Sequence, residues 1–318
     1  MDHYQKIVSS RGILRSCALH NREPRSSTAD VDFGEGVAHL PGGSIYCCTD
    51  ALATFAEHVM PAFTIPFVLV SGDADTVVSP EGLGADVFDR ILSNPMLRRW
   101  HAQNLDFADE KLRPIPIGLD YHTMWEHPAS FGEPNRTSPF EQEQVLLEIR
   151  RRGRPLAERK PQLYCNWHLS IGRPGRVTTS YSHHRADCYE QVDRSLCFFE
   201  PGFVQRFHSW THQAEYAFVL SPDGNGPDTH RTWEALVLGC IPVVRRNCLS
   251  ALLEDLPVAM VDDWREITPA FLDRTLASLA GRRFDFGKLF LEYWRSEVAG
   301  RRHDDVRPQT MEDFRALL

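Results

Sequence analysis

Residues 216–236 read YAFVLSPDGNGPDTHRTWEAL, and this stretch decides the fold class. It begins with an apolar run, which is typical of a strand buried on both faces, and ends with apolar residues at helical spacing. A glycine-containing loop joins the two parts, and Asp228 or Thr229 is well placed to cap the helix. The stretch therefore predicts a strand, a loop and a helix, the unit from which a covered parallel sheet is built.

The same alternation extends along both halves of the chain. Apolar runs at 44–48 and 67–71 flank a predicted helix at about 51–59. Residues 113–118 resemble an edge strand, because their prolines remove backbone donors. Further strands are predicted at 97–103, 162–167, 196–199, 240–245 and 258–261, and further helices at 84–92, 185–191, 204–212 and 229–238. The fold class is therefore α/β, with a parallel sheet in each half, and ligands of such sheets bind outside the carboxyl ends of the strands.

Two regions lack this alternation. The first forty residues carry glycine, proline and charge without a sustained period, so they predict a loose, peripheral arm. Residues 131–160 are polar, basic and rich in proline, with an amphipathic stretch near 142–152. They predict a linker that contains one helix.

Composition excludes several classes of protein. A chain of 318 residues with 42% hydrophobic content can fill two cores. Its net charge of −8 provides no basic field for nucleic acid. The longest apolar runs are far shorter than the roughly 20 residues of a membrane span, and the N-terminus lacks the apolar core of a signal peptide. A cytoplasmic protein without a transmembrane segment is expected.

The cysteine and histidine pattern indicates no metal site. The eight cysteines include no CxxC pair, and His183 and His184 are adjacent rather than at ligand spacing. Several cysteines lie inside apolar runs, so buried free thiols in a reducing compartment are expected.

The loop within residues 216–236 can bind an anion. Backbone N–H groups in a glycine-containing loop and the positive end of the following helix suit a diphosphate. Arg231 in the first turn adds a rigid donor fork, and Glu234 one turn later can accept hydrogen bonds from a ribose. The candidate donor-binding residues are Gly224, Asn225, Gly226, Asp228, Thr229, Arg231 and Glu234. Asp-Gly and Asn-Gly pairs are also ordinary turn formers, so the pattern alone leaves an unligated turn open.

The string SPDGNGPDTHRTWEALVLGCIPVV, followed by LPVAMVDDW, resembles the donor-binding core of exostosin-like glycosyltransferases. The resemblance covers about residues 163–264. Its matching residues are Arg231, Glu234, Ala235, Leu236, Gly239, Cys240, Ile241, Pro242, Val243, Asp263 and Trp264. The string QLYCNWHLSIGRPGR also resembles the first strand and loop of that family's C-terminal domain, which implies that Arg173 and Arg176 approach the donor phosphates. Two solvated loop arginines are an equally open reading.

The resemblance implies a GT-B fold, in which two Rossmann-like domains face a cleft. Residues 1–150 would form the acceptor-side domain and residues 151–285 the nucleotide-sugar domain, while helices in residues 286–318 would cross back to the first domain. The aromatic residues Phe290, Tyr293 and Trp294 at helical spacing fit such a helix, or equally a simple core-facing one.

The implied activity is transfer of a sugar from a UDP- or GDP-sugar donor to a glycan or related hydroxyl acceptor, as in polysaccharide biosynthesis. The closest branch of the family implies an inverting, metal-independent reaction without a cofactor. A retaining GT-B enzyme and a noncatalytic nucleotide- or glycan-binding protein remain alternatives, whereas a Rossmann dehydrogenase would need GxGxxG after its first strand.

Inverting transfer needs a base for the acceptor hydroxyl, and the first half must supply it. Asp73 and Asp75 follow the strand at 67–71, and Asp120 and His122 follow the run at 113–118. Asp73 is the first choice, because Gly72 lets the chain turn toward the cleft. Turn-forming aspartates and a surface histidine are the competing readings.

The Asp73-Ala74-Asp75 sequence also resembles a metal-binding DxD motif. In GT-A enzymes, however, that motif lies beside the nucleotide site, and here the donor resemblance lies elsewhere in the chain.

Overall fold

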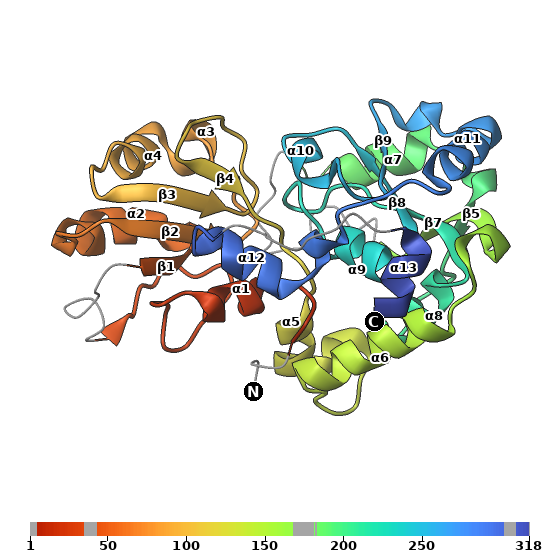
Figure 1. Ribbon diagram of the computed structural model, residues 1–318, viewed down its shortest axis with the longest axis horizontal. Coiled ribbons are helices and arrows are strands. Elements are labelled where there is room, and N and C mark those ends of the chain that lie inside the picture. The colour runs from red at the N-terminus through yellow and green to blue at the C-terminus, as the bar shows by residue number, and fades with distance from the viewer. Residues whose placement is uncertain (1–4, 35–42, 168–180, 182, 302–309, 318) are drawn as a thin grey trace.

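The computed structural model describes residues 5–34, 43–167, 181, 183–301 and 310–317. Within them the chain forms two sheets of parallel strands, with strand orders β1-β2-β3-β4 and β6-β5-β7-β8-β9. Figure 1 shows the sheets side by side, with α1 (Ser10–Ser16) and α12 (Leu291–Val298) between them. The predicted α/β class with a parallel sheet in each half is confirmed.

The first sheet follows the predicted order of elements. Its strands are β1 (Gly43–Cys48), β2 (Phe67–Gly72), β3 (Leu97–Ala102) and β4 (Leu112–Pro114). Its helices are α2 (Leu52–Thr54), α3 (Pro80–Leu83) and α4 (Ala85–Leu92), and a 3-10 turn and a π turn extend α2 on either side. The short β4 lies at the edge of the sheet, as the prolines of this segment predict.

The second sheet contains the stretch that decides the fold class. Its strands are β5 (Lys160–Cys165), β6 (Cys197–Phe199), β7 (Tyr216–Leu220), β8 (Ile241–Arg245) and β9 (Ala259–Val261). Its helices are α7 (His184–Gln191), α8 (Arg206–Gln213), α9 (His230–Leu238), α10 (Ser250–Leu253) and α11 (Pro269–Leu279). Every residue of β7 is buried, because helices cover both faces of a sheet of this kind.

Helix α6 (Pro139–Arg152) lies in the segment predicted as a linker and packs on α8 and α9. It begins with a capping box in which Ser138 and Glu141 bond reciprocally. At its other end, the guanidinium group of Arg150 fills the space beside Gly239, which has a φ of 72°. A side chain at Gly239 would clash with that group, so only glycine fits there.

The prediction of a peripheral N-terminal arm is wrong for residues 7–19, most of which are buried, whereas nearly all of residues 20–34 are exposed or half-buried. Residues 7–9 run through the centre of the molecule, where Val8 N donates to Leu289 O at 2.9 Å and Leu119 N donates to Val8 O at 2.8 Å. Helix α1 follows, and its first five residues are buried. The segment is too short to show a period, but its apolar residues Ile7, Val8, Ile13 and Leu14 all enter the larger hydrophobic core.

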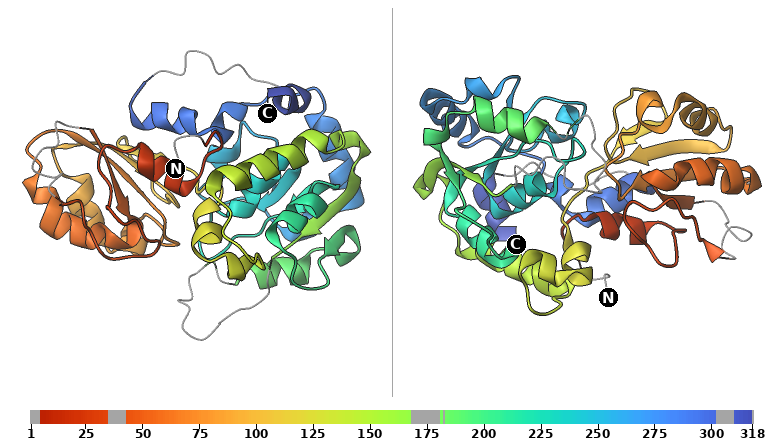
Figure 2. Two further views of the ribbon diagram at one scale, coloured as in Figure 1. Left: turned by 90° about the horizontal axis from the view of Figure 1, so that it is seen from below. Right: turned by 180° about the vertical axis from the view of Figure 1, so that it is seen from behind.

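The C-terminal segment contacts both halves of the chain. Helix α12 packs on α1, and Leu291 N donates to Lys6 O at 2.8 Å. Helix α13 (Met311–Leu317) packs on α6, and Figure 2 shows this segment lying across the molecule. The larger core accordingly joins the second sheet to one face of the first, while a smaller core fills the other face of the first sheet.

All eight cysteines are free thiols, and six of them are buried, as predicted. Among the described helices, none has the length and apolar character needed to cross a bilayer.

Candidate functional site

Loops that follow strands of the two sheets meet at one place. The loop after β7, residues 221–229, lies against the loops after β2, β3 and β4. Ile117 N donates to Asp228 Oδ2 at 2.7 Å, and His230 Nδ1 contacts Gly118 O at 2.7 Å. The carboxyl ends of the two parallel sheets therefore face one another, which is where such sheets bind ligands.

Asp73, directly after β2, is held in a strained conformation. Its φ is 60°, in the left-handed region that non-glycine residues seldom adopt, and it is only 7% exposed. Arg11 of α1 forms an ion pair with its Oδ2 at 3.0 Å, and Ser26 Oγ donates to its Oδ1 at 2.8 Å. Strain of this kind persists only where the surroundings fix the residue, and it is common at functional sites.

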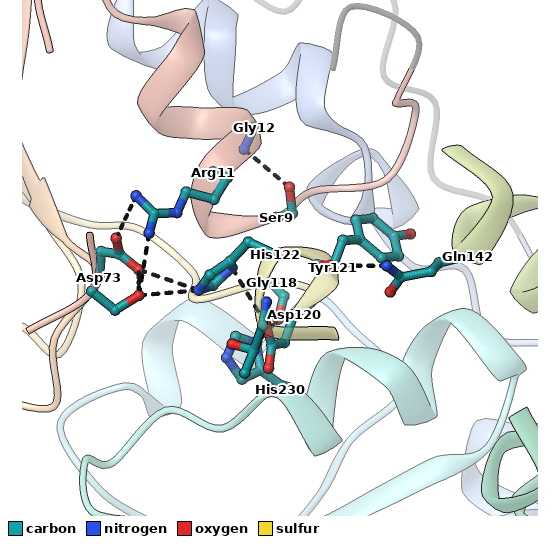
Figure 3. Close-up of polar contacts among 12 residues, drawn as sticks. Ser9, Arg11, Gly12, Asp73, Gly118, Asp120, Tyr121, His122, Gln142 and His230 are labelled. Atoms are coloured by element: carbon teal, nitrogen blue, oxygen red, sulfur yellow. Dashed lines mark hydrogen bonds and ion pairs between the residues drawn. The ribbon is translucent and has the colours of Figure 1, made fainter. Parts of the chain in front are cut away.

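His122 lies between two carboxylates, as Figure 3 shows. Asp120 caps α5 (Tyr121–Glu126) by accepting from Thr123 N at 3.0 Å. The same carboxylate lies 3.3 Å from His122 Nδ1, while Asp73 Oδ1 lies 3.7 Å from His122 Nε2. The two carboxylates thus flank the imidazole on both nitrogens.

Burial and charge act in opposite directions at this cluster. Burial lowers the pKa of His122, although the carboxylates of Asp120 and Asp73 oppose it. For Asp120, burial favours the neutral acid, but His230, His122 and Arg206 outweigh it and hold the pKa below its ordinary value. Burial thus favours the neutral imidazole of His122, while the surrounding positive charge favours the ionised carboxylate of Asp120.

Three of the four candidate catalytic residues are therefore brought together, and Asp75 is not among them. Asp75 Oδ2 instead accepts from Asn225 Nδ2 at 3.0 Å, across the junction of the two sheets. Sequence analysis missed Arg11 and Ser26, because both lie in the segment interpreted as a peripheral arm.

The loop after β7 is bonded to the first half of the chain. Gly226 packs so closely that a Cβ there would lie 2.7 Å from Asn104 Nδ2. Asp228 N donates to Asn104 Oδ1 at 3.2 Å, and Gly224 N donates to Gly226 O at 3.0 Å. These N–H groups are engaged within the protein, so their predicted role toward a diphosphate stays a prediction.

The predicted side-chain cap of α9 is absent from this structure. Thr229 is the N-cap residue, but its side chain does not accept a bond from the helix. The Asp228 carboxylate accepts instead from Ile117 N at 2.7 Å and from Trp233 Nε1 at 2.9 Å. Burial raises the pKa of Asp228 to about 6. Its carboxylate thus joins α9 to the segment after β4 rather than capping the helix.

Two arginines lie at the loop. Arg231 Nη1 donates to Pro222 O at 3.0 Å, and burial together with the charge of Arg185 lowers the pKa of Arg231 to about 9. Arg185, from α7, lies over Gly224, where a Cβ would be 3.4 Å from its Nη2. Beside them His184 Nδ1 lies 2.6 Å from Asp223 Oδ2. Arg185 was not identified from the sequence, since nothing in its local pattern links α7 to the loop.

Glu234 pairs with Arg206, whereas Arg231 donates to the loop. The carboxylate of Glu234 is 5% exposed and accepts from Arg206 Nη2 at 2.5 Å. The same Arg206 nitrogen donates to Asp120 O at 3.3 Å, so Arg206 links Glu234 of α9 to the residue that flanks His122. The ribose contact expected of Glu234 stays a prediction.

Two candidate donor-binding residues and the expected lack of a metal site are still to be considered. Arg173 and Arg176 lie outside the described residues. Within the described part of the chain, no group of three or more His, Cys, Asp or Glu side chains is arranged to hold a metal ion.

In comparisons with known proteins, no family model matches this sequence and no curated protein is significantly similar to it.

Proposed function

We propose that this protein is a GT-B glycosyltransferase that moves a sugar from a UDP- or GDP-sugar to a glycan hydroxyl. One observation carries the proposal: residues 117 and 118, just before Asp120 and His122, are bonded to Asp228 and His230, which flank the N-terminus of the helix that carries Arg231. Glycosyl transfer needs a base for the acceptor and fixed positive charge for the leaving diphosphate, and these two edges supply one each.

His122 is the base that the geometry favours, in place of Asp73. The Asp73 carboxylate is already engaged by Arg11 and Ser26, which stabilise its charge. Burial lowers the pKa of His122, and in the proposed mechanism its ring proton is on Nδ1, which lies 3.3 Å from Asp120 Oδ1. Nε2 is then left to accept a proton, and both carboxylates stabilise the imidazolium that forms.

In the proposed reaction the acceptor hydroxyl gives its proton to His122 Nε2 while its oxygen attacks the anomeric carbon. The bond from that carbon to the diphosphate oxygen breaks, and the electron pair goes to the diphosphate. Arg231 and Arg185 lie where they can neutralise this charge without a metal ion. A single displacement of this kind inverts the anomeric configuration.

Two further features support the GT-B arrangement. Helix α12 packs on α1, which agrees with a C-terminal helix that returns to the acceptor-side domain. The bonds of Asp228 and His230 to the loop 115–118 close the two sheets on one another. Closure of this kind excludes water from a transfer reaction.

The test is release of UDP or GDP from a panel of UDP- and GDP-sugars, followed by NMR of the product. Wild-type protein should consume one donor with inversion, and retained configuration would indicate the retaining alternative. If no donor raises the melting midpoint and none is consumed, the proposal is wrong.

A further inference from the structure

A serine hydroxyl lies between the two candidate bases of the cluster. Ser26 is in the loop between α1 and β1, and its Oγ is 2.8 Å from Asp73 Oδ1 and 3.1 Å from His122 Nε2. Arg11 Nη2 lies 3.4 Å from the same oxygen. A hydroxyl has one proton to give, and Ser26 donates it to Asp73 Oδ1, while His122 Nε2 lies within hydrogen-bond distance of the same oxygen. An oxygen of the hydroxyl type thus already lies beside the atom proposed as the base.

A cavity of about 240 Å³ is lined in part by Arg11 and His122, two of the residues that contact Ser26. Its lining includes Arg11 and His122, with Tyr121, Trp125, Arg15 and Glu126 around them. Pockets for drug-sized ligands measure roughly 300–1,000 Å³, so this one has room for about one sugar unit. A sugar ring has apolar C–H faces and a rim of hydroxyls, and the lining combines two aromatic rings with charged and polar groups.

We propose that Ser26 occupies the position of the acceptor hydroxyl in the unliganded protein. The terminal sugar of the acceptor binds in the cavity, and its hydroxyl displaces Ser26 Oγ from His122 Nε2. This inference rests on the proposed function. Ser26 has a second effect, because while its hydroxyl fills this position a water molecule cannot occupy the same place beside His122 Nε2.

The displacement has a readout that needs no acceptor. Ser26→Ala removes the hydroxyl, so water takes its place and the release of UDP or GDP without acceptor should rise roughly three- to tenfold, the range of one neutral hydrogen bond. Adding His122→Ala to Ser26→Ala should abolish that rise, because water then lacks its base.

Ser27→Ala is the matched control, since it lies in the same exposed loop. Among the described residues, its side-chain hydroxyl has no hydrogen bond to Asp73 or His122. Its rate should equal that of wild type. Melting curves of both serine variants establish that they fold.

The cavity is tested with methyl glycosides as acceptor probes. Trp125→Ala should raise the KM for the methyl glycoside that wild type uses. If Ser26→Ala, Ser27→Ala and wild-type protein all hydrolyse the donor at the same rate, the inference about Ser26 is wrong. The proposed transferase activity would not be affected by that result. Absence of donor binding and turnover in all these proteins would instead overturn the proposed function.

Discussion

Asp73 after β2 and the start of α5 present carboxylates and an imidazole, whereas the first turn of α9 and the adjacent α7 present guanidinium groups. Both edges arise from the same strand-loop-helix unit, yet their side chains suit different tasks. Asp73, Asp120 and His122 can accept and stabilise a proton, while Arg231 and Arg185 can stabilise a leaving anion. In the proposed transfer reaction, one kind of sheet edge, used twice, would supply a proton side and a charge side.

The largest expected effect is on the proton side. A general base typically supplies 10²- to 10⁴-fold, so His122→Ala should lower kcat by about that factor. Asp73→Asn should lower kcat less, about tenfold, because Asp73 acts on charge rather than on the transferred proton. Steady-state kinetics of the two variants decide the order. If Asp73→Asn loses more activity than His122→Ala, the role of base passes to Asp73.

A second effect concerns the stability of the first sheet. His101 in β3 is buried between Arg99 and Arg113, and burial and these charges lower its pKa from 6.5 to about 4. The folded state keeps His101 neutral while the unfolded chain protonates. The free energy of unfolding should therefore fall by about 3 kcal/mol from this residue as pH drops from about 6.5 to about 4.

Urea unfolding at several pH values measures this contribution. His101→Asn should remove that part of the pH dependence, whereas His58→Asn, at an exposed position, should leave it in place. Equal pH dependence of wild type and His101→Asn would contradict the buried neutral imidazole.

A smaller effect is expected on the charge side. Arg231→Ala should weaken binding of UDP or GDP by about 1.5–3 kcal/mol, the range for hydrogen bonds to charged groups. Arg246→Ala is the control, because Arg246 is exposed and its ion pair with Asp262 lies at the surface. Unchanged diphosphate affinity in folded Arg231→Ala protein would remove the arginine from the donor site.

The smallest expected effect is that of chelation. Arg231 and Arg185 supply the positive charge in this account, so turnover should be unchanged in EDTA. Loss of activity with recovery on adding Mn²⁺ or Mg²⁺ would make Asp73 and Asp75 candidate metal ligands instead.

The sequence predicted the elements of both sheets well, because apolar runs such as those of β2 and β7 have only one stable environment. It also placed Asp73 directly after a strand, whereas Asp120 and His122 lie at the start of α5, several residues beyond the end of β4. It did not predict that Asp75 contacts Asn225, since a shift of two residues along a loop changes the direction of a side chain.

The N-terminal segment was missed for a different reason. The seven-residue helix α1 is too short to show a period. The segment before it is held by bonds of Val8 to Leu289 and Leu119, which are far away in the sequence. The sequence also did not predict the partners of Arg231 and Glu234, because two residues three apart on a helix can contact different elements.

The division between the two edges is tested most directly by titrating the nucleoside diphosphate of the active donor into folded His122→Ala protein. His122→Ala should bind the nucleoside diphosphate with wild-type affinity although its kcat is 10²- to 10⁴-fold lower, because His122 is proposed to act on the acceptor and not on the diphosphate. Affinity that falls as far as in Arg231→Ala would show that His122 belongs to the donor site, and would contradict the division.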